Sequence, residues 1–420
     1  MARIKINRVF VLIVSILFIA TLVRAVVFIW GAHHHSIEVY EYEEIATNLI
    51  QGKGFLLPRY NAPHYSAIAP LFPYLCALVY LLFGHEIAYI IWLQIIFNVL
   101  MCYIIFCIGK TIFDKKVGLL SMLLVALHPG LIVYSTLKVH SLSLYALLIS
   151  AIVWMVIKNY NRASLKNKII LGVCLGLGAL ERPTLLAFLP VIFLWFYYYQ
   201  QNRKETLKIM LYSVCIVAIF LLPWSIRNLL RYKQFFLIQT NQWEGLWIGN
   251  NPHATGTLYL PNGTAVFETS PAEFKQKLYT LDEMGQMDLF KDTAIGFIKE
   301  NPLKFLILTS KKIFYFWWFS PQSGILYPSR WLGLYKAYYT IMIIFASIGF
   351  WLAFIKYPLR KFVLLLVFFL FALSILQSFY YAEGRHRWSV EALILILASF
   401  GIASVFLKLR TYFKKRACFQ

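Results

Sequence analysis

Residues 8–30 read RVFVLIVSILFIATLVRAVVFIW, an apolar run long enough to cross the hydrocarbon core of a lipid bilayer. Runs of the same kind cover most of the 420 residues, of which 60% are hydrophobic. The mean hydropathy of +0.67 is far above that of a soluble domain. A soluble fold of this length has too little interior to bury so much apolar surface. The sequence therefore predicts an all-α polytopic membrane protein.

The formal net charge of +22 comes from short basic loops between the apolar runs. Loops of this kind follow the positive-inside rule, so the charge indicates cytoplasmic connections and argues against a nucleic-acid partner. Arg3, Lys5 and Arg8 precede the first run, which places the N-terminus in the cytoplasm. The six cysteines form no CxxC pair and lie mostly within apolar runs, so we expect free thiols.

The positions of the other basic clusters decide the topology. They fall at 110–116, 158–168, 203–208, 356–361 and in the C-terminal tail. If all of them face the cytoplasm, the apolar runs between them pair as hairpins, and both termini are cytoplasmic. Residues 67–83 and 302–320 then cannot span, and we expect interfacial helices on the outer side. The predicted spans are 8–30, 87–108, 117–135, 139–157, 169–182, 183–200, 208–227, 333–355, 362–380 and 387–407.

This topology divides the chain into six parts. They are a first transmembrane helix (1–30), an outer loop with interfacial helices (31–86), a transmembrane core (87–227), an external region with an interfacial helix (228–332), C-terminal transmembrane helices (333–408) and a cytoplasmic basic tail (409–420). Within the external region, the stretch GLWIGNNPHATGTLYLPNG at 245–263 is dense in Gly, Asn and Pro. It predicts an ordered loop rather than a helix.

The outer loop after the first helix reads HHHSIEVYEYEEIATNLI at 33–50. Apolar residues at helical spacing predict an amphipathic helix over 41–50, with Glu41, Glu43 and Glu44 on its solvated face. Glu38 precedes this helix, and a carboxylate there can act as a general base or bind a divalent cation. The adjacent residues 33–35 are all His and point in different directions, so a loop is favoured over a metal site.

Other ionisable residues collect at the predicted outer ends of the helices. His140 follows Lys138 there, as an interfacial residue or a functional one, and Glu181 precedes Arg182 at an apolar boundary, where the two either pair with buried groups or mark a site. Further outer-end arginines are Arg227, Arg385 and Arg387. Arginines that converge on one face can bind a phosphate or pyrophosphate bidentately; the alternative is that they anchor to lipid headgroups.

These residues, in this order, resemble the GT-C membrane glycosyltransferases, and in particular the bacterial branch of the protein-mannosyltransferase and aminoarabinose-transferase superfamily (glycosyltransferase family 39). That branch shows an acidic residue followed four positions later by Tyr, then Ile-Ala, Asn-Leu and Gly-x-Gly-Phe. The matching residues are Glu38, Tyr42, Ile45-Ala46, Asn48-Leu49 and Gly52-Lys53-Gly54-Phe55. Later family motifs match Ala69-Pro70-Leu71-Phe72-Pro73, Gly84, Arg182-Pro183, Pro223-Trp224 with Arg227-Asn228, Gly249 to Gly256, and Arg385-His386-Arg387.

The resemblance implies a GT-C fold with about 10–12 transmembrane helices and outer-face interfacial helices. It implies an inverting glycosyltransferase that moves a sugar from a polyprenyl-phosphate donor to a lipid, polysaccharide or protein acceptor. Glu38 is then the catalytic base, with His140 as a second candidate. Candidates to bind the donor phosphate are Arg182, Arg227, Arg385, Arg387, Lys53 and Arg59, and candidates in the substrate loop are Tyr42, Asn250 and Asn251.

Two departures from the family pattern bear on metal binding. The first acidic residue is normally Asp and here is Glu38, and the second acidic position falls on His140 or Ser141. No cofactor is required, because the donor is already activated. A divalent cation on Glu38 and His140 remains an alternative. The departures are also compatible with another donor sugar or reduced activity.

The resemblance places the chain in a membrane, expected to be the bacterial inner membrane, with its active site toward the periplasm or exterior. Three alternatives to the transferase stay open: a lipid-linked glycan flippase, a glycan polymerase or ligase, and an inactive relative with a scaffold role. A transporter needs charged or broken helices near the bilayer midplane. Apart from Arg24, the polar residues collect at the outer ends instead, which favours the enzyme.

Overall fold

The structure is a computed structural model that describes residues 8–326 and 329–417. Arg3, Lys5 and Cys418 lie outside this part of the chain. The long helices are α1 (Arg8–His34), α4 (Ile87–Ile112), α5 (Lys115–Ala126), α6 (Pro129–Thr136), α7 (Leu142–Asn161), α8 (Leu165–Glu181), α9 (Phe188–Tyr199), α10 (Arg203–Tyr232), α16 (Ser329–Phe354), α17 (Tyr357–Ser378) and α18 (Gly384–Ala417). A 3₁₀ helix, η1 (Pro183–Ala187), leads into α9.

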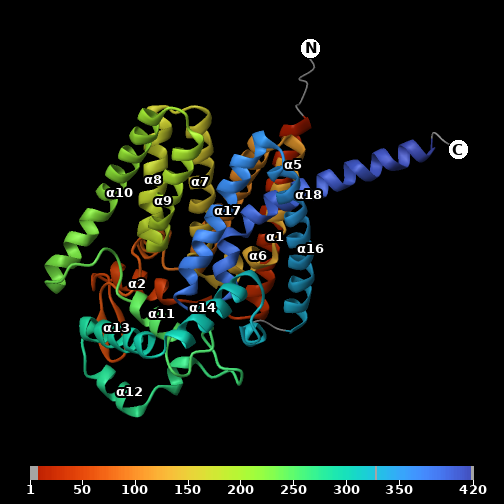
Figure 1. The fold of residues 1–420 in the computed structure, drawn as a ribbon. Helices are drawn as coiled ribbons and strands as arrows, with labels where there is room; N and C mark the ends of the chain where they lie inside the picture. The colour runs from red at the N-terminus through yellow and green to blue at the C-terminus, as the bar shows by residue number, and fades with distance from the viewer. Residues whose placement is uncertain (1–7, 327–328, 418–420) are drawn as a thin grey trace.

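The remaining elements lie together at one end of this helical bundle (Figure 1). They are α2 (Glu41–Ile50), α3 (Leu71–Phe83), α11 (Gln242–Gly249), η2 (Val266–Thr269), α12 (Ala272–Tyr279), α13 (Glu283–Glu300), α14 (Pro302–Trp317) and α15 (Ser323–Leu326). Two small sheets join them, one of β1 (Glu38–Val39) parallel to β4 (Lys138–Val139), and one of β2 (Leu57–Arg59) antiparallel to β3 (Ala62–His64).

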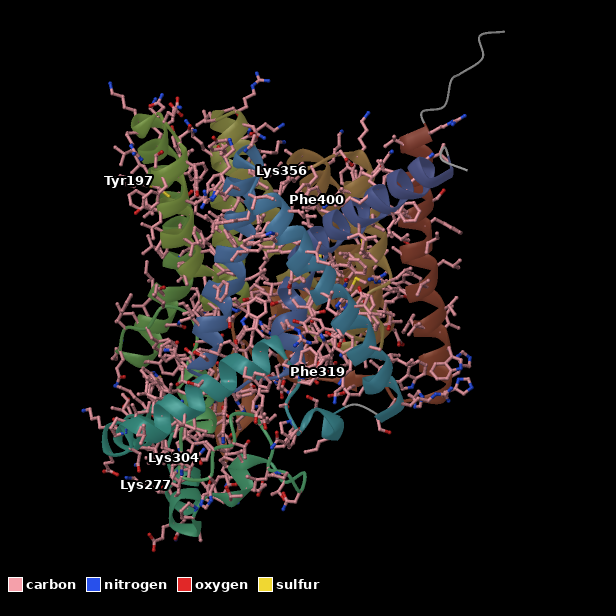
Figure 2. The ribbon with its side chains drawn as sticks, turned by 45° about the vertical axis from the view of Figure 1, so that its right-hand side comes forward. Tyr197, Lys277, Lys304, Phe319, Lys356 and Phe400 are labelled. Carbon is pink, nitrogen blue, oxygen red and sulfur yellow. The ribbon has the colours of Figure 1, made fainter. Side chains whose placement is uncertain are left out.

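The basic connections lie at the other end of the bundle. In Figure 1 the turns from α7 to α8 and from α9 to α10 are at the top, and Lys356 and Tyr197 occupy the same end in Figure 2, opposite Lys277 and Lys304. Lys168 Nζ donates to Glu205 at 2.7 Å, which ties two of these connections together. Polar residues at their ends also start the helices: Asp114 accepts from the backbone N–H of Lys116 and Val117 and so caps α5.

Seven helices are long and apolar enough to cross a membrane, within the described residues. The number rises to eight if the bent pair α5 and α6, whose axes differ by 50°, counts as one span. The two other predicted spans correspond to α8, with 17 residues, and to the short apolar segment Pro183–Tyr199. The chain is therefore an all-α polytopic membrane protein, as predicted.

The predicted span over 117–135 is not one continuous helix, because the chain breaks between α5 and α6. Pro129 opens α6, where the missing N–H of proline costs nothing, and His128 Nδ1 accepts from the N–H of Leu131 at 3.1 Å. Arg24, buried on α1, donates to the carbonyl oxygen of Ala126 at 2.8 Å, at the end of α5. The break thus has a cap on one side and a charged donor on the other.

Three short helices follow the prediction. α2 covers the expected residues 41–50, and α3 and α14 occupy the segments expected to be interfacial. At 13 and 16 residues, both are too short for a 30 Å hydrocarbon core.

Two expected loops are partly helical. α1 continues to His34, since His33 and His34 contact the carbonyl oxygens of Ile29 and Trp30 at 2.7 and 2.8 Å. The stretch expected as a loop over 245–263 begins inside α11, which buries Trp247 and Ile248 against α13 before it ends at Gly249. α11 continues because an apolar face is still being buried there, which a composition count does not register.

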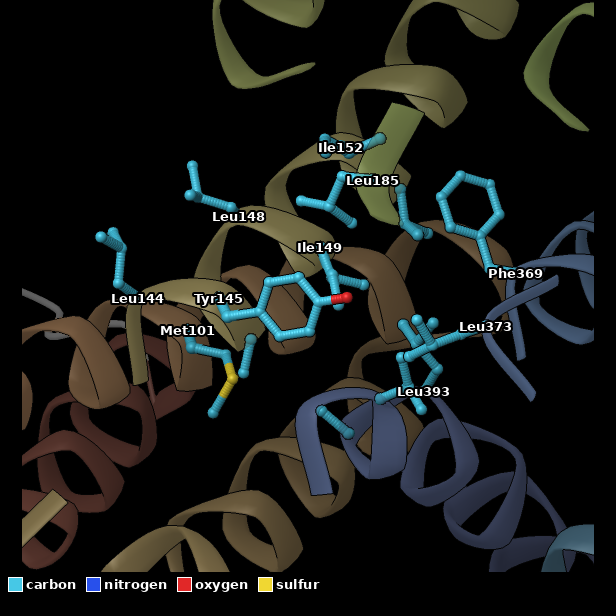
Figure 3. Packing of buried hydrophobic residues seen from close by; sticks show 14 of the residues in the cluster. Met101, Leu144, Tyr145, Leu148, Ile149, Ile152, Leu185, Phe369, Leu373 and Leu393 are labelled. Carbon is cyan, nitrogen blue, oxygen red and sulfur yellow. The ribbon is translucent and has the colours of Figure 1, made fainter. Parts of the chain in front are cut away.

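Figure 3 shows the part of the hydrophobic core that supports the site. Side chains from α4, α7, η1, α17 and α18 meet there, and Leu185, Phe369 and Leu393 are fully buried or nearly so. Tyr145 lies among them with its hydroxyl 3.1 Å from that of Thr184, at the rim of this core. The packed helices therefore hold η1 and the start of α7 in fixed positions.

Candidate active site

A cavity of about 420 Å³ lies where the helical bundle meets the outer elements. Its walls come from the start of α2, the residues before α7, the junction of α8 with η1, α11, the end of α17 and the start of α18. Polar and ionisable residues on these walls are Tyr40, Glu41, Tyr42, His140, Glu181, Arg182, Gln242, Gln377, Tyr381, Arg385 and His386. Apolar lining comes from Ile68, Ala187 and Leu376.

The β1–β4 pair brings two distant segments to this cavity. It sets Glu38 opposite Lys138 and Val39 opposite Val139, so that Tyr40 and His140 follow side by side. Gln94 of α4 fixes the β4 segment, because its side chain donates to the Lys138 carbonyl at 2.9 Å and accepts from the His140 N–H at 2.8 Å. A two-residue sheet is thus anchored by a buried amide on a transmembrane helix.

His140 is buried, with one ring edge toward Arg385. Its Nδ1 accepts from the N–H of Leu142 at 3.0 Å, and its Nε2 lies 3.3 Å from Nη1 of Arg385. Burial, followed by the charges of Arg385 and Arg182, lowers the pKa of His140 well below its ordinary value. The neutral ring then carries its hydrogen on Nε2, because Nδ1 is an acceptor. Two donors therefore face each other, an arrangement that an anion between them would stabilise.

Arg182 is the second cation on the cavity wall. Pro183 after it disfavours helical geometry, so Arg182 is extended, with φ −150° and ψ 121°, and leaves the axis of α8. Its guanidinium lies over the ring of Tyr145, 4.8 Å from the centroid. Among the described residues no carboxylate lies within 4.0 Å of it. Arg385, in contrast, has Oε2 of Glu383 at 2.5 Å from its Nε.

Glu38 is not on the cavity wall, but it interacts with Tyr40 and with the charge of Arg385, which both line it. Its side chain is 52% exposed and forms an ion pair with Lys138. Burial of the carboxylate would raise its pKa, but the hydrogen bonds from Lys138 and Tyr40 outweigh this effect and lower the pKa below its ordinary value. Glu38 is therefore ionised at neutral pH and can accept a proton from a group at the cavity mouth.

Two other carboxylates line the cavity directly. Glu41 was expected on a solvated face but is half-buried on the wall, because α2 turns Tyr42 inward and leaves Glu44 exposed. Glu181, at the last position of α8, is buried on the opposite wall. The sequence analysis identified Glu181 only as an ionisable residue at an apolar boundary. Its position on the cavity wall depends on the tertiary structure.

The structure brings four of the predicted site residues onto this cavity: Tyr42, His140, Arg182 and Arg385. Arg227 and Arg387 lie elsewhere. Arg227 donates to the Tyr65 carbonyl at 2.8 Å and to Ser66 Oγ at 2.7 Å, beside a separate groove. Arg387 is buried, paired with Glu391 and bonded to the Phe316 carbonyl. Both guanidinium groups thus hold parts of the fold together.

The other candidates also lie away from the cavity. Lys53 is exposed, and Arg59 forms a bidentate pair with Glu244 at 2.9 Å. Asn250 donates to the Phe379 carbonyl at 2.7 Å, and Asn251 donates to the Trp247 carbonyl at 2.9 Å. The two asparagines fix the backbone of the loop after α11.

Tyr40 and Tyr381 lie on the cavity wall but were not singled out by the sequence. Tyr381 lies four positions before the matched Arg385, so proximity to that motif was the available signal, and His386 belongs to the motif but was given no role. In the described part of the chain, no three His, Cys, Asp or Glu side chains are grouped to hold a metal ion. Lys138 engages Glu38 and Arg385 faces His140, so this pair does not fit a cation.

Comparison with known proteins finds a matching family model over part of the chain and solved structures of similar fold. The sequence model of the dolichyl-phosphate-mannose-protein mannosyltransferases matches residues 67–226. A search of curated proteins finds no relative.

Among solved structures, the apo oligosaccharyltransferase of Archaeoglobus fulgidus matches with a TM-score of 0.61 at 16% identity, over 97% of this chain and 52% of that chain. The same values hold for the oligosaccharyltransferase AglB of Archaeoglobus fulgidus in complex with an inhibitory peptide and a dolichol-phosphate. The A. fulgidus enzyme tethered to an acceptor peptide gives 0.60 at 17% identity, over 95% and 50% of the two chains.

The chain has the GT-C fold, and its resemblance to the protein-mannosyltransferase branch of GT-C membrane glycosyltransferases is confirmed by the matching family model. It spans about half the length of the solved structures that it matches. At this level of identity the structural likeness establishes the fold alone, so the reaction has to be argued from the site.

Proposed function

We propose that the protein is an inverting glycosyltransferase that takes a sugar from a polyprenyl-phosphate donor. The observation that supports this most is the cavity itself, where Arg182, Arg385 and the Nε2–H of His140 border one space beside an apolar wall. Such a space suits a phosphate ester with a lipid tail. The phosphate meets fixed positive charge, and the first isoprene units meet Ile68, Ala187 and Leu376.

The reaction is a single displacement. The acceptor hydroxyl oxygen attacks the anomeric carbon of the sugar, and the bond from that carbon to the phosphate oxygen breaks. The electron pair leaves with the polyprenyl phosphate, and Arg182 and Arg385 stabilise the charge that develops there. Glu38 takes the acceptor proton, because it is ionised and interacts with Tyr40 of the cavity wall. His140 is neutral and orients the phosphate rather than acting as the base.

No metal step is part of this proposal. The donor is already activated as a phosphate ester, and guanidinium groups supply the charge that a cation would otherwise supply. We propose that the protein lies in a bacterial inner membrane with the basic loops in the cytoplasm, which puts the cavity on the periplasmic or exterior side. The acceptor is a hydroxyl of a lipid, a glycan or a protein.

The test is sugar transfer by the purified protein in detergent from radiolabelled polyprenyl-phosphate monosaccharides. The variant is Glu38→Gln, and the matched control is Glu44→Gln, an exposed carboxylate of α2. We expect the wild type and the control to consume at least one donor, and Glu38→Gln to lose about 10²–10⁴-fold in rate.

The possible outcomes separate the alternatives. Consumption that survives in Glu38→Gln would move the base to Glu41 on the cavity wall. Donor that binds but is never consumed with any acceptor would favour a flippase. Failure of the wild type to bind any polyprenyl phosphate would contradict the proposed function.

A further inference from the structure

Glu181 is a buried carboxylate with few polar neighbours. The residue is 4% exposed, and no hydrogen bond of ordinary geometry reaches Oε1 or Oε2 in the described part of the chain, although the Ser141 hydroxyl lies beside the carboxylate. Glu181 lines the same cavity as Arg182 and Arg385. Buried carboxylates in proteins normally accept several well-formed hydrogen bonds. The remaining acceptor capacity of Glu181 points to a ligand.

The adjacent arginine does not neutralise it. Arg182 follows Glu181 directly but directs its guanidinium over the ring of Tyr145, and no ion pair forms between the two side chains. Two side chains of opposite charge, adjacent in the sequence, therefore line one cavity without forming an ion pair with each other. Because both residues border the same space, a single ligand there can contact both of them.

The chemistry of such a ligand is constrained from both sides. It must present negative charge to Arg182 and Arg385, and hydrogen-bond donors to Glu181. A metal ion can coordinate Glu181 but is repelled by the two guanidinium groups. A free anion meets the first and is repelled by Glu181. A neutral sugar joined to a phosphate meets both, because its hydroxyl groups donate and its phosphate accepts.

We infer that Glu181 binds hydroxyl groups of the donor sugar and sets the donor class as neutral and polyhydroxylated. This inference rests on the proposed function, because it takes the phosphate beside Arg182 and Arg385 as that of the donor. It predicts that a uronic-acid donor is rejected, since a second carboxylate would lie against Glu181. Glu181 contacts the sugar but does not accept the transferred proton. It therefore determines the affinity for the donor and the donor specificity.

The experiment compares binding of bare polyprenyl phosphate with binding of polyprenyl-phosphate mannose and polyprenyl-phosphate glucose. Glu181→Gln keeps the side-chain volume and removes the charge, and Glu44→Gln is the matched control. We expect Glu181→Gln to weaken binding of at least one hexose ester by about 10- to 100-fold, as for a hydrogen bond to a charged group. Binding of the bare phosphate should stay as in the wild type. The melting temperature of the empty protein should not fall, because an unpaired buried charge is removed.

Monodeoxy donors refine the test. One hydroxyl should account for the loss, so that its deoxy donor binds the wild type as weakly as the intact donor binds Glu181→Gln, with no further loss when both changes are combined. Equal losses for bare phosphate and hexose esters, or no loss for any ester, would overturn the inference while leaving the transferase intact. A wild type that binds neither class of lipid would overturn both. If Glu181→Gln does not fold, Glu181→Ala is measured against the same lipids.

Discussion

At the residue scale, the ion pair between Glu38 and Lys138 depends on the pairing of two short strands. Lys138 reaches Glu38 because β1 and β4 run parallel, with these two residues in register. The motif at 38–55 singled out Glu38 from the sequence, whereas Lys138 lies a hundred residues away and was noted only as a neighbour of His140. The sequence could therefore predict that Glu38 is a site residue. It could not predict that Lys138 is its partner, because that depends on how two distant strands pair.

Lys138→Met should change the pH dependence of the reaction. The hydrogen bond and charge of Lys138 lower the pKa of Glu38, so their loss raises it. A base must be deprotonated to act, so the acid limb of kcat/KM against pH should move to higher pH. Activity near pH 8 should fall little. The measurement is the pH–rate profile of the variant beside the wild type.

An unmoved acid limb in Lys138→Met would mean that Glu38 does not set it. Exposed Lys277, in α12, offers a charge-matched control, since Lys277→Met removes a cation that does not line the cavity. No limb from His140 is expected near pH 6.5 in either protein, because burial and the charges of Arg385 and Arg182 keep this ring neutral.

At the scale of the elements, α16 and α18 approach each other through glycines. A Cβ added to Gly349 would lie 2.0 Å from the Leu397 carbonyl oxygen, and one added to Gly401 would lie 2.0 Å from that of Phe345. Small residues allow membrane helices to pack at backbone contact. The start of α18 carries Arg385, so this contact contributes to the position of a cavity residue.

Gly349→Ala should therefore destabilise the protein by about 1–3 kcal/mol, as expected for overpacking at a close contact. Gly333→Ala, on the same helix with no atom within 4 Å of the added Cβ, should be neutral or slightly stabilising. Thermal unfolding in detergent measures both. Equal melting temperatures for the two variants would show that α16 and α18 are not in backbone contact at this point.

The same scale shows what periodicity could and could not predict. The spacing of Tyr42, Ile45 and Ala46 correctly predicted α2, because one face of a surface helix has to be buried. The break before Pro129 was missed, since an apolar run continues through it and only the cap at His128 marks it. The composition of residues 245–263 predicted a loop. The first of these residues instead belong to α11, where Trp247 packs against α13.

For the molecule as a whole, charge parity along the chain predicted that the segments of α3 and α14 do not span, and both helices are outside the seven that are long and apolar enough to cross a membrane, as are α8 and α9. Charge parity also predicted that the arginines at the helix ends lie on one face of the molecule. A shared face does not mean that they belong to one site. Arg182 and Arg385 line one cavity, whereas Arg227 borders a separate groove of about 730 Å³ with Arg231. Which of the two spaces receives the lipid phosphate is decided by tertiary structure.

The central claim is that the cavity of Arg182 and Arg385 holds the donor. The most direct measurement is photocrosslinking of the purified protein with a polyprenyl phosphate that carries a diazirine on its first isoprene unit, followed by mass spectrometry of the labelled peptides. We predict labels on η1 and around Leu376, which excess polyprenyl phosphate removes and Arg385→Gln weakens. Labels confined to Tyr65, Arg227 and Leu230 in the other groove would contradict the account.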